Sequence, residues 1–220
     1  MTALPKHPFP KHHPSDALLV AYGAGCLSEG LSLAVAAHLA LCPVCRAAAR
    51  TVDALGGALL DTDAGLDLDG GALARTLARL DGPRETPASP LLAAAGPFPQ
   101  PLAAYVGGDL RWQRLAPGVR RLELLRRTSR GGAAQMLRIA PGVTLPHHGH
   151  GGLELTLVLS GSFADETGRY GPGDLAEVDQ DTRHQPIADT HEECVCLIAT
   201  DAPLRFTGIL GRLVQPFIGM

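Results

Sequence analysis

Three potential metal ligands lie close together in the second half of the chain, in the pattern His148-x-His150-x3-Glu154. All three are at even positions, so in an extended chain their side chains point to the same face. His184 offers another imidazole thirty residues later. Three imidazoles and one carboxylate suit Zn, Fe, Mn, Ni or Cu about equally by ligand type. The alternative, a polar strand pair with solvated histidines, does not account for the full spacing.

A second group of ligand residue types, with softer donors, lies nearer the N-terminus. His38, Cys42 and Cys45 follow one another at positions i, i+4 and i+7, which share one face of a helix. Two thiolates and one imidazole favour zinc in a tetrahedral site. A fourth ligand must come from elsewhere, and His12 and His13 are both available. The alternatives are a redox dithiol and a helix face that binds no metal.

The remaining cysteines do not indicate a disulfide framework. The chain has five cysteines, an odd number, which argues against such a framework in a reducing compartment. Cys194 and Cys196 alternate within an apolar segment. Core packing is the favoured interpretation, because the neighbouring residues are apolar and no cation that would activate a thiol is adjacent. A redox pair near the metal is the alternative.

The overall composition limits the location and the partners of the chain. The net charge of −3 gives no general attraction to nucleic acid or to an anionic membrane. No apolar stretch approaches the about 20 residues of a membrane span. The N-terminus lacks the apolar central segment of a secretory signal. We therefore expect a cytoplasmic protein that contacts neither membrane nor nucleic acid directly.

The elements that must position these ligands divide into helices and then strands. Ser15 is a helix N-cap candidate, and Pro43 is tolerated in a first helical turn. The pattern predicts helices over 15–22, 28–41, 43–60 and 72–80. The last one is either an amphipathic surface helix or a docking face for a partner.

Composition changes sharply after the helices. Six prolines fall between residues 81 and 101, which predicts a semi-extended linker. Short apolar runs between Gly and Pro turns then indicate a β-sandwich or barrel over 102–220. The predicted strands are 120–125, 134–139, 153–159, 175–178 and 193–199. The expected class is α + β, with a helical domain over 1–80.

The segment from Gly142 to Gly161 resembles the first motif of the cupin family, position for position. The run 170–174 followed by His184 resembles the second motif, although Ala188 stands where an Asn is often found. This resemblance implies a jelly-roll β-barrel. It also implies that His148, His150, Glu154 and His184 bind one metal at the barrel mouth.

The N-terminal pattern, His13…His38-x3-Cys42-x2-Cys45, looks like the signature of zinc-binding anti-sigma factors. Together with the cupin, it resembles the ChrR-type anti-sigma factors over nearly the whole chain. Further matching runs are 13–19, 148–167, 194–197 and 200–206. The resemblance implies that His13 completes the first zinc site.

The same resemblance implies a function. In that family the N-terminal domain binds an extracytoplasmic-function (ECF) sigma factor and blocks its access to RNA polymerase. The cupin domain is needed for release in response to singlet oxygen or related oxidants. We expect a regulatory protein and no enzyme, with zinc at the first site and zinc or another divalent transition metal in the cupin. The rival hypotheses are a metal-dependent cupin dioxygenase or isomerase, and a regulator whose signal is metal occupancy itself.

Overall fold

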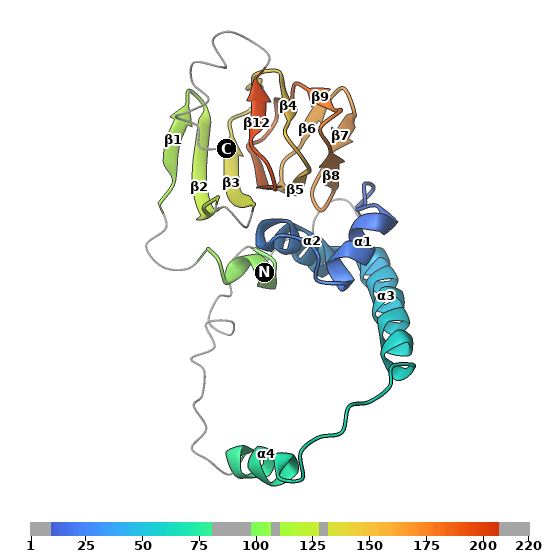
Figure 1. Ribbon diagram of the computed structural model, residues 1–220. Coiled ribbons are helices and arrows are strands. Elements are labelled where there is room, and N and C mark those ends of the chain that lie inside the picture. The colour runs from blue at the N-terminus through green and yellow to red at the C-terminus, as the bar shows by residue number, and fades with distance from the viewer. Residues whose placement is uncertain (1–9, 81–97, 107–110, 128–131, 207–220) are drawn as a thin grey trace.

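Helices form the first part of the chain and strands the second (Figure 1). The structure, a computed structural model, describes residues 10–80, 98–106, 111–127 and 132–206. The helices within these ranges are α1 (Asp16–Gly23), α2 (Glu29–Leu41), α3 (Pro43–Asp61), α4 (Ala72–Leu80) and α5 (Gln100–Ala103). The four predicted helices correspond to α1–α4, and α5 was not predicted.

Local chemistry sets where the first three helices begin and end. The Ser15 hydroxyl accepts a hydrogen bond from the Leu18 backbone N–H at 3.2 Å, which caps α1. Cys42 leaves the helical region at the end of α2, and its sulfur caps α3 by accepting from the Cys45 backbone N–H. Pro43 fills the first position of α3. The chain therefore bends by 119° between α2 and α3.

Two layers of antiparallel sheet form the β-region. The strands are β1 (Gln113–Ala116), β2 (Val119–Leu125), β3 (Ala133–Ile139), β4 (His148–His150), β5 (Glu154–Ser160), β6 (Phe163–Asp165), β7 (Gly168–Tyr170), β8 (Leu175–Val178), β9 (Arg183–His184), β10 (Ile187–Ala188), β11 (Cys194–Thr200) and β12 (Leu204–Phe206). The large sheet has the order β1-β2-β3-β11-β5-β8, and two small sheets have the orders β10-β6-β7 and β12-β4-β9. The five predicted strands match β2, β3, β5, β8 and β11 within one residue at each end.

The two faces of the large sheet contribute to two separate apolar clusters. On β5, Leu155 and Leu157 belong to the cluster that also contains helix residues, whereas Val158 belongs to the cluster inside the β-region. Cys194 and Cys196 are buried in the inner cluster, as packing predicts. The hydrogen bond with Cys194 and burial raise the pKa of Cys196 well above its ordinary value, so this thiol stays protonated.

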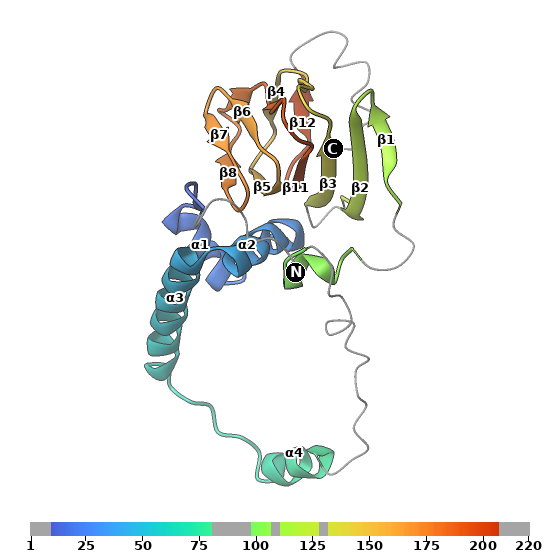
Figure 2. The same cartoon turned by 180° about the vertical axis from the view of Figure 1, so that it is seen from behind.

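The outer cluster joins the helices to the sheet in one core. Leu31 and Val35 of α2 and Leu102 of α5 belong to the same buried cluster as Leu122 and Met136 of the sheet. Figures 1 and 2 show α1, α2 and α5 against the strand region from both sides. The division into 1–80, 81–101 and 102–220 stays a prediction. Residues 81–97 of the predicted linker and residues 207–220 lie outside the described part of the chain.

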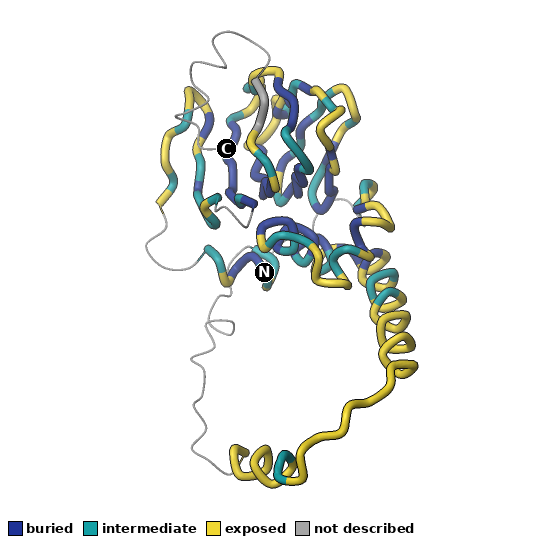
Figure 3. Tube along the Cα trace, viewed as in Figure 1, coloured by how far each residue is buried: buried dark blue, intermediate teal, exposed yellow. Residues whose placement is uncertain are grey.

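α4 and the distal half of α3 stand away from this core. Both are coloured as exposed along most of their length (Figure 3). In the described residues, no single helix is long and apolar enough to cross a membrane. Within the described ranges, the bent pair α2–α3 meets the length and composition of a membrane span when its two helices are taken together.

Candidate metal centres

The structure brings His13, His38, Cys42 and Cys45 together. Their ligand atoms all lie within 4.8 Å of one another. His13 Nδ1 is 3.5 Å from Cys42 Sγ and 3.2 Å from Cys45 Sγ. His38 comes from the last turn of α2, and both thiols come from the start of α3. We name these four residues the helical cluster.

The protonation of His38 leaves one nitrogen available for a metal. Its Nδ1 donates to the Gly173 carbonyl oxygen at 2.9 Å, so Nε2 carries the lone pair of the neutral ring. That Nε2 is buried and has no hydrogen-bond partner. Burial lowers the pKa of His38 to about 4, which keeps the ring neutral. A buried nitrogen without a partner, beside two thiols, fits a metal ligand.

The thiols also fit a metal site. Burial and the neighbouring Cys42 thiol raise the pKa of Cys45 to about 12. Thiolate ligands are stable in such a place only when a positive charge compensates them, and a bound cation supplies that charge.

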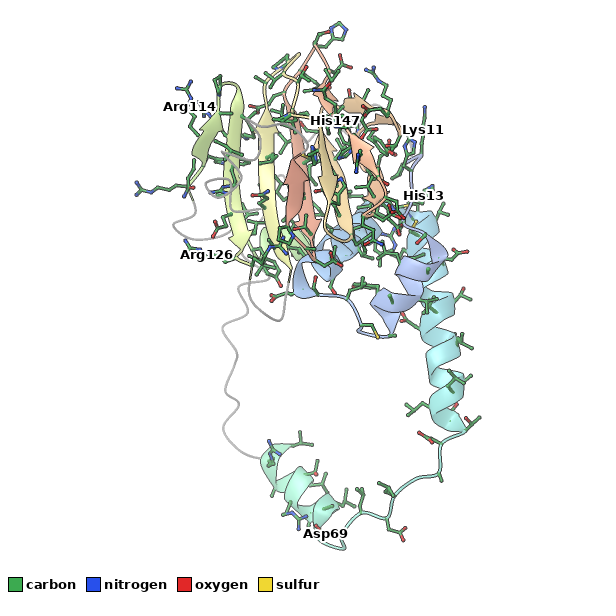
Figure 4. The ribbon with its side chains drawn as sticks, turned by 45° about the horizontal axis from the view of Figure 1, so that its top comes forward. Lys11, His13, Asp69, Arg114, Arg126 and His147 are labelled. Atoms are coloured by element: carbon green, nitrogen blue, oxygen red, sulfur yellow. The ribbon has the colours of Figure 1, made fainter. Side chains whose placement is uncertain are left out.

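His12 does not join the helical cluster. Its backbone N–H donates to Asp174 Oδ1 at 3.0 Å, and its ring Nδ1 lies 3.2 Å from Asp174 Oδ2. Its ring centroid lies 4.4 Å from that of Tyr170. Of the two adjacent histidines that the ligand chemistry left open, the structure places His13 beside the thiols. Figure 4 shows His13 where the helices meet the strand region.

A second cluster, named here the barrel cluster, contains His148, His150, Glu154 and His184. Their ligand atoms also lie within 4.8 Å of one another. The Nε2 atoms of His148 and His150 are each 3.2 Å from His184 Nε2. Glu154 Oε2 is 3.5 Å from His150 Nδ1. Strand pairing explains part of this arrangement, because His148 on β4 is the register partner of His184 on β9.

Hydrogen bonds on the far side of two imidazoles aim their Nε2 atoms at the centre. His148 Nδ1 donates to the Pro146 carbonyl oxygen at 2.8 Å. His184 Nδ1 donates to Asp165 Oδ2 at 2.7 Å. Such outer contacts fix the tautomer and the orientation of metal-binding histidines. Asp165 was not predicted from the sequence, because no spacing pattern marks a carboxylate on a neighbouring hairpin.

The charges in the barrel cluster suit a cation. Burial alone would raise the pKa of Glu154, but the hydrogen bond and charge of His150 and the other two imidazoles lower it below its ordinary value. Burial also lowers the pKa of His148. Three imidazoles around an ionised carboxylate form a donor set for a divalent transition metal.

His147, next to the first ligand, lies outside the cluster, as its position in the alternation predicts. Its side chain is exposed, and its Nε2 lies 3.9 Å from Glu166 Oε1. Figure 4 shows it at the end of the strand region away from the helices. His147 precedes β4 by one residue and is exposed, whereas the ligand His148 at the start of the strand is buried.

Comparison with known proteins gives consistent matches along the chain. A family model described as the ChrR cupin-like domain matches residues 104–203. The anti-sigma-E factor ChrR of Cereibacter sphaeroides is 50% identical over 210 residues, which cover 94% of this chain and 97% of the relative. A crystal structure of Rhodobacter sphaeroides SigE in complex with the anti-sigma ChrR aligns with a TM-score of 0.75 and 47% identity, covering 87% of this chain and 99% of that chain. The chain therefore belongs to the ChrR family of anti-sigma factors.

Proposed function

We propose that this chain binds an ECF-type sigma factor through its helices, inhibits it, and releases it under oxidative stress such as exposure to singlet oxygen. One observation carries the proposal: the ChrR chain to which almost the whole fold aligns was crystallised in complex with SigE. The identity of 50% extends over both the helices and the strands.

The exposed apolar side chains support a docking surface on α3 and α4. On α4, Leu73, Leu77 and Leu80 are exposed and fall at i, i+4 and i+7, on one face of the helix. On α3, Leu55 and Leu59 are also exposed. A nine-residue helix is marginal in water by itself, so a partner that covers this face would stabilise it. Of the two interpretations of α4, this favours docking.

We further propose that the helical cluster holds zinc through His13, His38, Cys42 and Cys45. Two thiols and two imidazoles match the preference of Zn²⁺ for four soft, tetrahedral ligands. With all four positions filled by protein groups, the metal would hold α2, α3 and the preceding segment together. It would have no position open for catalysis.

For the barrel cluster we propose zinc or another divalent transition metal, with a sensing role. Each of the four ligands is no more than 6% exposed, so little of the cluster can be reached by a substrate. That burial supports a binding protein more than a metal-dependent dioxygenase or isomerase, which needs an open coordination position and access to it.

The test compares two cysteine variants of the full chain. Cys42→Ala removes a ligand of the helical cluster, whereas Cys26→Ala removes an exposed thiol outside it. We expect Cys42→Ala to lose one zinc per chain and to stop binding the sigma factor, and Cys26→Ala to retain both. Full inhibition of sigma-dependent transcription by Cys42→Ala would overturn the docking proposal. Chelator-dependent release without any oxidant would instead favour a regulator of metal occupancy.

A further inference from the structure

The two clusters are joined by a continuous set of contacts through one part of the β-region. We propose that residues 165–175, which include β7 and the turn into β8, transmit the state of the barrel cluster to the helical cluster. This inference rests on the proposed binding of metals to both clusters. Through this route the barrel cluster would regulate metal binding at the helical cluster.

The route begins at Asp165, at the end of β6. Its Oδ2 accepts from Nδ1 of the barrel ligand His184 at 2.7 Å. Its Oδ1 accepts from both the backbone N–H (2.8 Å) and the hydroxyl (2.6 Å) of Thr167. The Asp165 side chain is completely buried. Because one buried carboxylate holds both His184 and Thr167, a rotation of the His184 ring displaces Asp165 and Thr167 with it.

The second step passes from Thr167 to Tyr170. The Thr167 hydroxyl has one proton, which it donates to the Asp165 carboxylate, so it accepts from the Tyr170 hydroxyl at 2.9 Å. The Tyr170 ring stacks on Phe163 with centroids 4.9 Å apart, and it lies against the His12 ring at 4.4 Å. Tyr170 thus links the hairpin to the segment that precedes α1.

The third step holds that segment in place. Asp174, a buried carboxylate in the turn, accepts at Oδ1 from the backbone N–H groups of Lys11 (2.5 Å) and His12 (3.0 Å). The Leu175 backbone N–H donates to the His12 carbonyl oxygen at 3.2 Å. His13 follows directly, so these bonds position the residue whose imidazole reaches the two thiols of the helical cluster.

The fourth step reaches a second ligand. The Gly173 carbonyl oxygen accepts from His38 Nδ1 at 2.9 Å, while the Gly173 backbone N–H donates to the Val158 carbonyl oxygen at 2.8 Å. Gly173 has φ +89°, and a Cβ there would lie 2.9 Å from Pro10 Cγ, so the turn fits closely against the N-terminal segment. One turn of the β-region therefore positions two of the four ligands of the helical cluster.

The expected direction of the coupling follows from this geometry. A metal on the barrel cluster fixes the His184 ring, and through it Asp165 and the turn. When that metal is lost or its ligands change, the turn is held less firmly, and His13 and His38 lose part of their orientation. Loss of such outer contacts typically weakens metal binding 10–100-fold. Damage to the barrel therefore loosens metal at the helical cluster.

The experiment titrates the metal-free, reduced full chain with Co²⁺ and follows thiolate-to-cobalt charge-transfer absorption. The signal reports the helical cluster, because the barrel cluster contains no thiol. Glu154→Gln disturbs the barrel cluster without touching the proposed route. We expect it to weaken Co²⁺ binding at the thiols at least about fivefold, the lower end of typical couplings between sites. In a Tyr170→Phe background, which keeps the ring but removes the hydroxyl, the effect of Glu154→Gln should fall below about twofold.

Two further backgrounds complete the design. Thr167→Val removes the hydroxyl that accepts from Tyr170, so it should reduce the effect of Glu154→Gln on Co²⁺ affinity as Tyr170→Phe does. Tyr105→Phe removes a hydroxyl just after α5 that donates to Glu29 of α2 at 2.9 Å, away from the route, and should leave the coupling intact. Circular dichroism and thermal unfolding establish that each variant is folded.

The proposal is overturned if Glu154→Gln leaves the Co²⁺ affinity of the thiols unchanged in the wild-type chain. It is also overturned if Glu154→Gln lowers that affinity by the same factor in all backgrounds. The titration contains no sigma factor, so its outcome is independent of the proposed sigma binding. A chain that binds the sigma factor without this coupling would overturn the route alone. Coupling without sigma binding would overturn the proposed function alone.

Discussion

Gly30 lies where α2 packs against the backbone of the large sheet. A Cβ at this position would be 2.9 Å from the Ala133 carbonyl oxygen and 3.4 Å from Ala134 Cβ. β3 cannot easily move away, because it is paired with β2 on one side and β11 on the other. Gly30→Ala therefore forces α2 and the sheet apart and tests whether the helices and strands share one core.

The expected magnitude follows from two opposing effects. Alanine is more favourable than glycine by about 0.8–1 kcal/mol in a helix interior, and by less at the second residue of α2. Overpacking a core contact costs about 1–3 kcal/mol. We expect a net loss of about 1–2 kcal/mol in the free energy of unfolding. At about 2–4 °C per kcal/mol for a chain of this size, the melting temperature falls by about 2–8 °C.

Gly56→Ala is the matched control. Gly56 lies within α3 and a Cβ there would meet nothing within 4 Å, so only the helix propensity changes, and stability should rise by up to about 1 kcal/mol. Urea unfolding followed by circular dichroism compares the variants at equal, saturating zinc, because bound metal shifts stability. If Gly30→Ala stabilises the chain as Gly56→Ala does, α2 does not pack on β3 and the shared core is wrong.

Three further predictions address the two clusters and the docking surface. At saturating zinc, which keeps the helical cluster occupied, Glu154→Ala should leave inhibition of the sigma factor intact but reduce its release by oxidants in a transcription assay. Loss of sigma binding under these conditions would place the barrel in the inhibitory surface. Because the pKa of Cys45 is about 12 and thiols generally are protonated near neutrality, zinc binding displaces thiol protons. The logarithm of the zinc affinity should therefore rise by about two per pH unit between pH 7 and 8, and a flat profile in competition titrations would exclude two thiolate ligands. Leu77→Asp should weaken sigma binding about tenfold or more with zinc content unchanged, since burying an unpaired carboxylate in an apolar interface costs well over the about 1.4 kcal/mol that corresponds to tenfold. Unchanged affinity would exclude α4 from the interface.

Elements with strong local signals could be predicted from the sequence. Ser15 and Pro43 mark helix starts through their own local chemistry, and the alternation of β5 predicts its two faces and places its limits within one residue. β1, β6, β7, β9, β10 and β12 were not predicted. They have two to four residues each, too few for a period to appear, and they depend on pairing with distant segments.

The ligand sets were readable from residue type and spacing, whereas the contacts that orient them were not. The Asp165–His184 bond spans 19 residues, and the His38–Gly173 bond spans 135. Neither has a sequence pattern, because each depends on how the β-region folds. The burial of α2 did leave a signal. Leu33 lies on the opposite side of the helix from Leu31 and Val35, and a helix that is apolar on most sides is generally buried.

The bend between α2 and α3 explains how a metal at the helical cluster would control a partner bound elsewhere. α2 is held by the sheet, and it carries His38 near its end. The exposed leucines of the proposed docking surface belong to α3 and α4, and α3 begins with the turn that contains Cys42 and Cys45. A metal that joins these ligands fixes the 119° angle between the two helices. Without it, α3 is tied to α2 by the chain and weaker packing, so the docking surface can change direction while the core stays folded.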